Sequence, residues 1–179
     1  MKADKNRKTQ NIRQGFTLIE IILVVVIIGI AAFLTIPMLS DAADMQARSA
    51  ANQIVADLDY AKSMAMTHQQ NYSLVFDTAD NSYQIQDASG TVIEHPLRPG
   101  TNYVISFSDD RHLDQVDITN VNFDSDISDA ITFDYLGSPY SGIGTGSTLN
   151  DGQITVQAGD FTLTVDVEPV TGYVTISGF

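Results

Sequence analysis

The hydrophobic and polar positions of the chain divide it into three stretches. In the first, 24 consecutive residues from Phe16 to Leu39 are almost wholly apolar, and Glu20 is the one charged residue among them. A helix of that length spans roughly 36 Å, which is enough to cross a bilayer. The first stretch therefore predicts a transmembrane helix.

The second stretch is amphipathic. Its apolar residues recur three or four positions apart, on one face of a helix: Ala47, Ala51, Ile54, Leu58, Ala61 and Ala65. Asp44 with Arg48, and Asp59 with Lys62, have the spacing of favourable ion pairs on a helix. We therefore expect one helix from about residue 16 to about residue 68, kinked at Pro37.

The third stretch begins at Asn71, where short runs of Val, Ile, Thr, Phe and Tyr alternate with turn residues. The expected strands lie at 71–77, 82–95 (bent at its Ala-Ser-Gly), 103–107, 115–119, 130–135, 153–157, 161–167 and 173–177. No helical pattern interrupts them, which favours an antiparallel sheet or sandwich. Residues 136–152 are rich in Gly and Ser and are expected to form a flexible loop. The predicted fold class is α+β, with the long N-terminal helix packed on a C-terminal antiparallel β-domain.

The charge is divided unevenly along the chain. Residues 1–15 carry five basic residues and one acidic residue, whereas residues 16–179 carry four basic and 21 acidic residues, a net charge of −17. Positive charge before the apolar stretch predicts a cytoplasmic N-terminus and an exported C-terminal domain. An acidic body with no basic residue in its last segment argues against a nucleic-acid partner.

Candidate chemical sites are weak. The chain has no cysteine, so no disulfide or thiol nucleophile is possible. Clustered carboxylates can bind calcium, and residues 108–129 contain seven: Asp109, Asp110, Asp114, Asp117, Asp124, Asp126 and Asp129. They do not match a calcium loop of known spacing, and a solvated acidic loop is the alternative. No histidine spacing or serine motif indicates a metal or catalytic centre, so we expect no enzyme activity and no cofactor.

The segment "GFTLIEIILVVVIIGIAAFLTIP" resembles the N-terminus of type IV prepilins. The resemblance implies that a prepilin peptidase cuts after Gly15 and that Phe16 becomes an N-methylated terminus. It also implies a single-pass inner-membrane protein with a periplasmic C-terminal domain. Other pilin subunits and an inner-membrane assembly platform are the remaining partners that it implies.

The resemblance also gives Glu20 a role. Cleavage creates a positive amine in apolar surroundings, where an unpaired charge is costly. Glu20 would neutralise that amine on a neighbouring subunit and so set the register of assembly. The alternative is a carboxylate at the headgroup interface with no partner.

A second resemblance is to the GspH/FimT family of minor pilins and pseudopilins. It is carried by Ala61, Lys62 and Ala65, by "ITFDYLGSP" and by "VEPVTGYVTI". The implied function is a minor subunit of a type IV pilus or of a type II secretion pseudopilus. The domain boundaries that follow are a leader at 1–15, a transmembrane and assembly helix at 16–39, an amphipathic half at 40–69 and a β-domain at 70–179.

An alternative function stays open. The N-terminus would then be an ordinary signal sequence, cut near "SDAAD" at residues 40–44, and the β-domain would be a secreted or membrane-anchored ligand binder. That hypothesis gives "GFTLIE" no purpose, and the uncharged core from Ile21 to Ile36 slightly exceeds the usual length in signal peptides.

Overall fold

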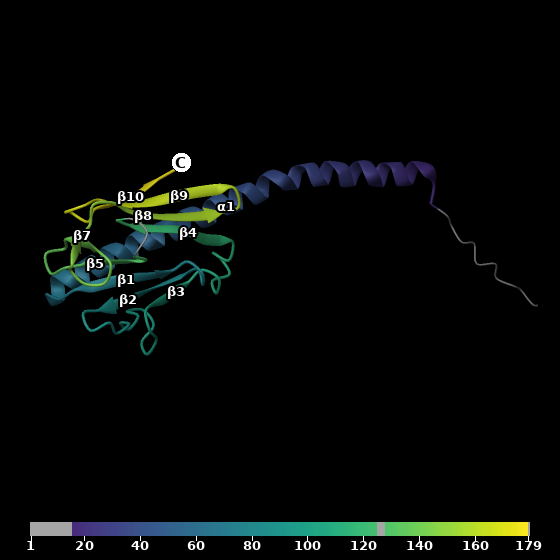
Figure 1. The fold of residues 1–179 in the computed structure, drawn as a ribbon. Helices are drawn as coiled ribbons and strands as arrows, with labels where there is room; N and C mark the ends of the chain where they lie inside the picture. Colours follow the sequence, from purple (N-terminus) through teal and green to yellow (C-terminus); the bar gives the residue numbers. More distant parts are fainter. Residues whose placement is uncertain (1–15, 125–127, 179) are drawn as a thin grey trace, which may run out of the picture. The chain divides into compact units, whose positions relative to one another are not determined.

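One long helix and ten strands make up the described structure. The computed structural model describes residues 16–124 and 128–178, and of residues 33–41 it describes the backbone alone. Helix α1 spans Leu18–His68, which confirms the expected helix (Figure 1). The chain divides after Met38 into two compact units, which are described separately below.

The C-terminal end of α1 has a well-defined stop. Gln69 adopts a left-handed backbone conformation (φ +57°), and the N–H of Gln70 donates to the carbonyl of Ala65 at 3.3 Å. This pairing satisfies a carbonyl that the end of a helix otherwise leaves without a partner. The chain then turns directly into the first strand.

The strands form two antiparallel sheets (Figure 1). The first has the order β3-β2-β1-β5-β6-β7, with strands Val104–Ser106, Ser82–Asp87, Tyr72–Asp77, Ala130–Phe133, Pro139–Ser141 and Ser147–Thr148. The second has the order β10-β9-β8-β4, with strands Val174–Ser177, Phe161–Val167, Gly152–Ala158 and Val116–Phe123. The predicted α+β class, with a helix on antiparallel sheets, is confirmed.

Three segments differ from the sequence-based expectation. Residues 136–152 contain β6 and β7, so they are not simply a flexible loop. Strand β4 continues past residue 119, where the predicted strand ended. Its register shifts between Ile118 and Asn120, and this bulge interrupts the alternation of side chains on which the prediction relied. Residues 91–95 make only isolated bridges, from Val92 to Gln86 and from Glu94 to Asn102.

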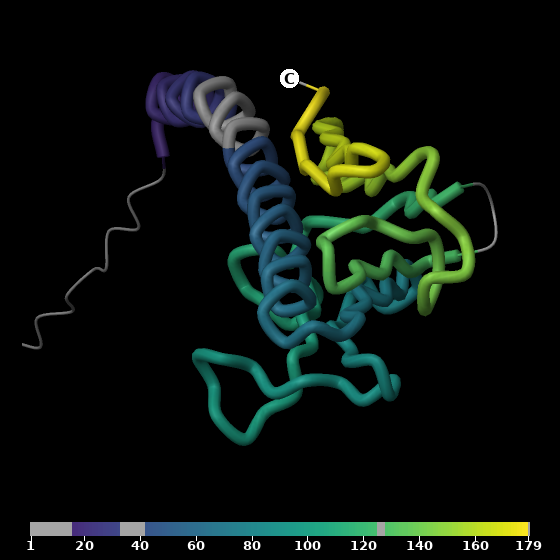
Figure 2. Tube along the Cα trace, turned by 90° about the vertical axis from the view of Figure 1, so that its left-hand side faces the viewer, coloured from purple at the N-terminus to yellow at the C-terminus, as the bar shows by residue number. Residues whose placement is uncertain are grey.

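The core of the globular unit forms where α1 meets the strands. Residues 42–68 of α1 run beside the strands in Figure 2. All six residues of the predicted apolar face are fully buried: Ala47, Ala51, Ile54, Leu58, Ala61 and Ala65. They pack with inward-facing side chains of both sheets, among them Leu74, Phe133 and Val165. Four of the six are alanines, whose short side chains let the helix backbone approach the sheets closely.

Candidate functional site

The N-terminal unit exposes apolar side chains on every side of its helix. All 17 residues from Phe16 to Ala32 are exposed, and the large apolar ones among them range from 47% for Val24 to 79% for Phe16. Helices that are apolar all round are found inside membranes or large protein cores rather than in water. In the part of the chain that is described, no helical stretch combines the length and the hydropathy of a membrane span.

The first turn of α1 is held by Thr17. Its hydroxyl oxygen accepts the backbone N–H of Glu20 at 3.3 Å, and its carbonyl accepts that of Ile21 at 3.2 Å. Thr followed three residues later by Glu is the spacing of a capping box, in which each side chain serves the other's backbone N–H. A carboxylate in the first turn also interacts favourably with the helix dipole. Thr17 therefore caps the first turn of α1 through the backbone N–H of Glu20, which the sequence analysis did not anticipate.

The other predicted site residues of this unit are placed as follows. Phe16 and Glu20 border the same surface hollow, together with Ile21 and Val24. Gly15 lies outside the described residues. Pro37 lies within α1, where its side chain is not described, so the kink there stays a prediction.

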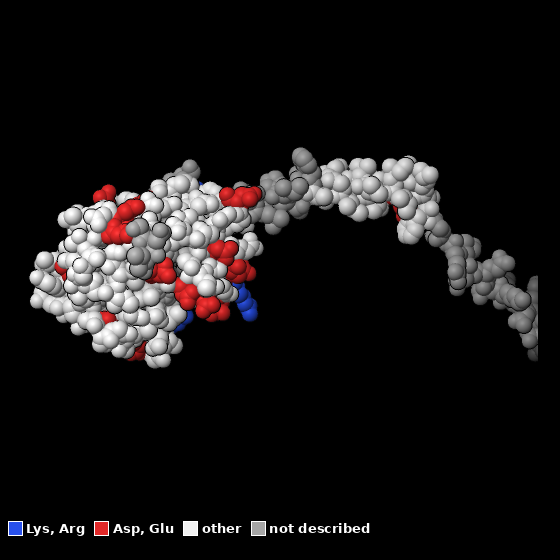
Figure 3. Space-filling view, viewed as in Figure 1, with Lys and Arg blue, Asp and Glu red and all other residues white. Residues whose placement is uncertain are grey.

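The acidic residues at 108–129 do not gather into one site. Asp124 accepts the backbone N–H groups of Asn150 and Asp151 at 2.7 and 2.8 Å, and Asp117 accepts the side-chain amide of Asn81. Asp126 lies outside the described residues. Among the residues that are described, no three His, Cys, Asp or Glu side chains are placed to hold a metal ion. Carboxylates recur over the face of the globular unit shown in Figure 3, as expected of a solvated acidic surface.

Three segments distant in sequence meet at Lys62 on α1. The Lys62 Nζ donates to the carbonyls of Thr171 and Gly172 at 2.7 and 3.3 Å. A Cβ on Gly137, in the β5–β6 turn, would lie 3.1 Å from both Lys62 Cε and Met66 Sδ. One on Gly172 would lie 2.9 Å from the ring of Phe133 and 3.2 Å from the Gly137 carbonyl.

The meeting of these segments, which we call the Lys62 junction, explains three sequence motifs at once. Lys62 comes from the motif at 61–65, Gly137 from "ITFDYLGSP" and Gly172 from "VEPVTGYVTI". The ion pair of Lys62 with Asp59 that their spacing predicted is not formed. Among the described residues the ion pair within 4 Å is that of Arg48 with Asp44.

A buried carboxylate joins α1 to the first sheet. Asp57, on the buried side of α1, is 7% exposed. Its Oδ2 accepts the Tyr83 hydroxyl at 2.5 Å and its Oδ1 accepts the Tyr103 hydroxyl at 2.7 Å. The Tyr103 ring stacks on His95, with centroids 4.6 Å apart, and on Tyr60 at 5.6 Å.

The surroundings of Asp57 shift its titration. Burial raises the pKa of Asp57 above its ordinary value of 3.8, and the hydrogen bonds from Tyr83 and Tyr103 offset part of that rise. Burial together with the Asp57 carboxylate raises the pKa of both tyrosines, so both hydroxyls remain donors at neutral pH. The arrangement is a structural polar cluster with every partner satisfied.

Comparisons with known proteins agree with this architecture. A family model described as Type II transport protein GspH matches residues 50–172. The chain belongs to the GspH family. The model of the prokaryotic N-terminal methylation motif matches residues 10–36. With both matches, the GspH-family chain is a minor pseudopilin or pilin, a structural subunit.

Two solved structures of one minor pseudopilin share the fold. The minor pseudopilin EpsH from the type 2 secretion system of Vibrio cholerae matches with a TM-score of 0.53 at 8% identity, over 74% of this chain and 97% of that one. A second EpsH structure gives 0.50 at 8% identity, over 74% and 94%. The type IV minor pilin FimU of Pseudomonas aeruginosa gives 0.44 at 15% identity, over 73% and 91%. The comparison with curated proteins gave no match.

The Lys62 junction predicts that Gly172 tolerates no side chain. Gly172→Ala adds a methyl group against Phe133 in a left-handed backbone conformation (φ +57°), so we expect a loss of about 2–4 kcal/mol in unfolding free energy. Gly90→Ala is the matched control, because Gly90 also has a positive φ but has open space around it. The control should lose about 1 kcal/mol. Urea unfolding of the detergent-solubilised protein measures both, and equal losses would mean that the contact with Phe133 is unimportant.

The buried Asp57 predicts a pH-dependent difference from its amide. Because the folded-state pKa lies above the unfolded value, Asp57 favours folding most below about pH 3.8, and that contribution is lost as the pH rises through the folded pKa. An amide at this position does not titrate and has no such loss. The unfolding free energy of Asp57→Asn minus that of the wild type should therefore increase from pH 3.5 upward and level off above the folded pKa. Urea unfolding across pH 3.5–8 tests this, and a constant difference would contradict it.

Proposed function

We propose that the chain is made as a precursor that is cut after Gly15, and that the segment 16–39 first anchors it in the inner membrane and then packs in a filament. The observation that carries this proposal is the fully exposed apolar surface of residues 16–32, joined to a folded globular unit. Such a surface needs apolar surroundings throughout the life of the protein. A bilayer supplies them before assembly, and the helices of other subunits supply them afterwards.

The orientation follows from charge. The net charge of +4 at residues 1–15 favours a cytoplasmic N-terminus, which places the acidic globular unit in the periplasm. The prepilin peptidase would therefore act at the cytoplasmic side of the membrane. Other pilin or pseudopilin subunits and an inner-membrane assembly platform are the further partners. We propose no catalytic activity and no cofactor.

Glu20 is proposed to pair with the amine of a cleaved Phe16 on a neighbouring subunit. Two features support it: Glu20 is exposed, and it borders the same hollow as Phe16. The capping box does not compete with this role, because one carboxylate oxygen can serve the backbone while the other meets an ammonium group. A charge that is removed from water without its partner costs several kcal/mol. The pair would therefore favour the one axial register of neighbouring subunits in which Glu20 meets the amine.

Of the two candidate machines, the type II secretion pseudopilus is our first choice. The family model that matches residues 50–172 is described as a type II transport protein. The type IV pilus is the second candidate. The alternative function, a secreted ligand-binding β-domain, requires loss of the apolar segment.

Cleavage predicts one N-terminus. Protein extracted from the membranes of its native host should begin at Phe16 and carry one additional methyl group, as measured by intact mass and N-terminal peptide mass. Gly15→Leu should abolish cleavage, because a large residue replaces the one before the cut. A wild-type N-terminus near Ala43 would overturn the proposal and favour the secreted binder.

Glu20→Gln separates charge pairing from helix capping. Glutamine also serves in a capping box, so the helix should be unchanged, but it cannot neutralise an amine. We expect normal cleavage and at least a tenfold lower fraction of the subunit in sheared filaments, measured by quantitative immunoblot. Thr17→Ala is the matched control, since it removes the cap and keeps the charge, and it should assemble nearly normally. Normal assembly of Glu20→Gln would leave capping as the role of Glu20.

A further inference from the structure

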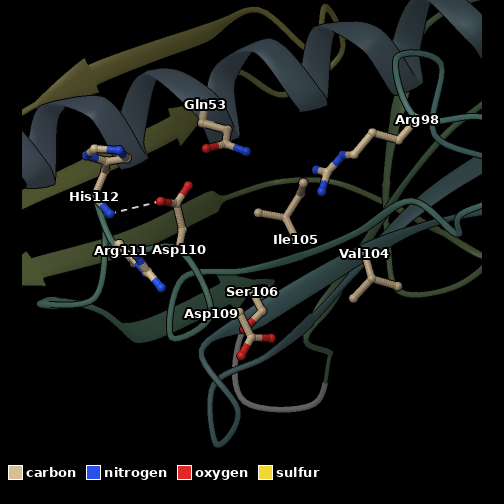
Figure 4. A pocket seen from close by; sticks show the side chains of 9 residues that line it. All are labelled: Gln53, Arg98, Val104, Ile105, Ser106, Asp109, Asp110, Arg111 and His112. Atoms are coloured by element: carbon tan, nitrogen blue, oxygen red, sulfur yellow. Dashed lines mark hydrogen bonds between the residues drawn. The ribbon is translucent and has the colours of Figure 1, made fainter.

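A hollow of about 530 Å³ lies beside strand β3 (Figure 4). Four parts of the chain line it: Gln53 of α1, all of β3, and two loops that contribute Arg98 and residues 109–112. Its volume is in the range of sites that hold small ligands or short peptide segments. No function described above uses it.

The free edge of a sheet borders this hollow. Strand β3 is the terminal strand of its sheet. Next to it, the carbonyl of Tyr103 accepts the N–H of Ile85 at 3.2 Å, and the N–H of Phe107 donates to the carbonyl of Asn81 at 3.0 Å, so both groups face β2. Backbone groups alternate in direction along a strand, so those of Ser106 and the carbonyl of Val104 point away from β2. An edge of this kind is a template for one more strand.

Two basic and two acidic side chains line the hollow: Arg98 and Arg111, and Asp109 and Asp110. Residues 16–179 contain four basic residues, and two of them, Arg98 and Arg111, line the hollow. The other two are engaged elsewhere: Arg48 pairs with Asp44, and Lys62 donates to the carbonyls of Thr171 and Gly172.

Arg98 lies beside a buried histidine. Its Nη2 is 3.3 Å from Nε2 of His95, which is 8% exposed and stacks on Tyr103. In Figure 4 the Arg98 guanidinium extends toward the space between Gln53 and Ile105. An exposed guanidinium in this position is suited to bind a carboxylate in two-pronged geometry.

Within the part of the chain that is described, no carboxylate forms an ion pair with Arg98. Asp110 accepts the backbone N–H of His112 at 2.9 Å within its own turn. Asp109 points away from Arg98 in Figure 4. The hollow thus has a cationic end at Arg98, an apolar floor at Ile105 and an unpaired strand edge along one side.

We propose that this hollow binds an extended acidic segment of a different protein, which adds to β3 as a further strand and places a carboxylate against Arg98. The backbone edge supplies the hydrogen bonds and Arg98 supplies the selection for acid. A second copy of this chain is a poorer occupant, because pairing of β3 with β3 would bring two Arg98 side chains to one short ladder and would press together two chains whose residues 16–179 each carry a net charge of −17. The proposal does not depend on which machine the subunit belongs to.

Photo-crosslinking in the native host tests the proposal. A benzoylphenylalanine at Val104, in the full chain, should crosslink to one defined segment of another protein, with an Asp or Glu within two residues of the crosslinked position by mass spectrometry. Arg98→Ala should lower the yield at least fivefold. Arg48→Ala, which removes a cation outside the hollow, is the matched control and should leave the yield within twofold. The same probe at Thr175 of β10 should give no crosslink that depends on Arg98.

Binding of the identified segment, made as a peptide, then tests the edge itself. Ser106→Pro removes the outward backbone N–H without removing a bond to β2, so it should weaken binding to the purified full chain at least tenfold in fluorescence anisotropy. Arg98→Ala, a surface change, should weaken it at least fivefold and covers the case in which Ser106→Pro fails to fold. Crosslinks only to β3 of a second copy, to lipid or to nucleic acid would overturn the proposal. The absence of any crosslink at Val104 would also overturn it, as would a crosslink yield and a peptide affinity that are the same in Arg98→Ala as in the wild type.

Discussion

The close approach of α1 to the two sheets is the constraint on which the rest of the globular unit depends. Ala47, Ala51, Ala61 and Ala65 are all fully buried, so the helix backbone itself lies near the strands. A longer side chain at any of these positions would push the sheets away from the helix. This approach also brings Asp57 within reach of Tyr83 and Tyr103, whose hydroxyls satisfy a carboxylate that is costly to bury alone.

One helix therefore meets two different sets of surroundings. Residues 16–32 expose apolar side chains all round, whereas residues 42–68 bury a single face and leave the other to water. The sequence encodes this difference in composition and in spacing, because the first half is apolar at nearly every position and the second repeats its apolar residues every three or four positions. The division suits the function we propose, in which the first half passes from lipid to protein neighbours while the second holds a folded unit throughout.

Periodicity and turn residues predicted most of the fold. The buried face of α1 could be read from the spacing of Ala and Leu, and β9 from an uninterrupted run of alternating residues between Gly159 and Pro169. The Asp57 cluster could not, because Asp57 looks like any helical acid beside Leu58, and its partners lie 26 and 46 residues away. The partners of Lys62 could not be predicted either. They lie 109 and 110 residues away, and they are backbone carbonyls, which every residue has and no side-chain pattern identifies.

The contacts inside the chain separate motif residues that build the globular unit from those for which we propose a role between subunits. Lys62, Gly137 and Gly172 make their contacts within the globular unit. Lys62 bonds to a backbone carbonyl there, and the two glycines leave the space that neighbouring side chains occupy. Phe16 is 79% exposed, and the described contact of Glu20 in its first turn is made by its backbone N–H rather than by its carboxylate. A charge at the start of an apolar helix is too costly to be incidental to folding. The proposed pairing with the amine of a neighbouring subunit would give that charge a partner, and it would do so through the same helix by which we propose that the subunit assembles.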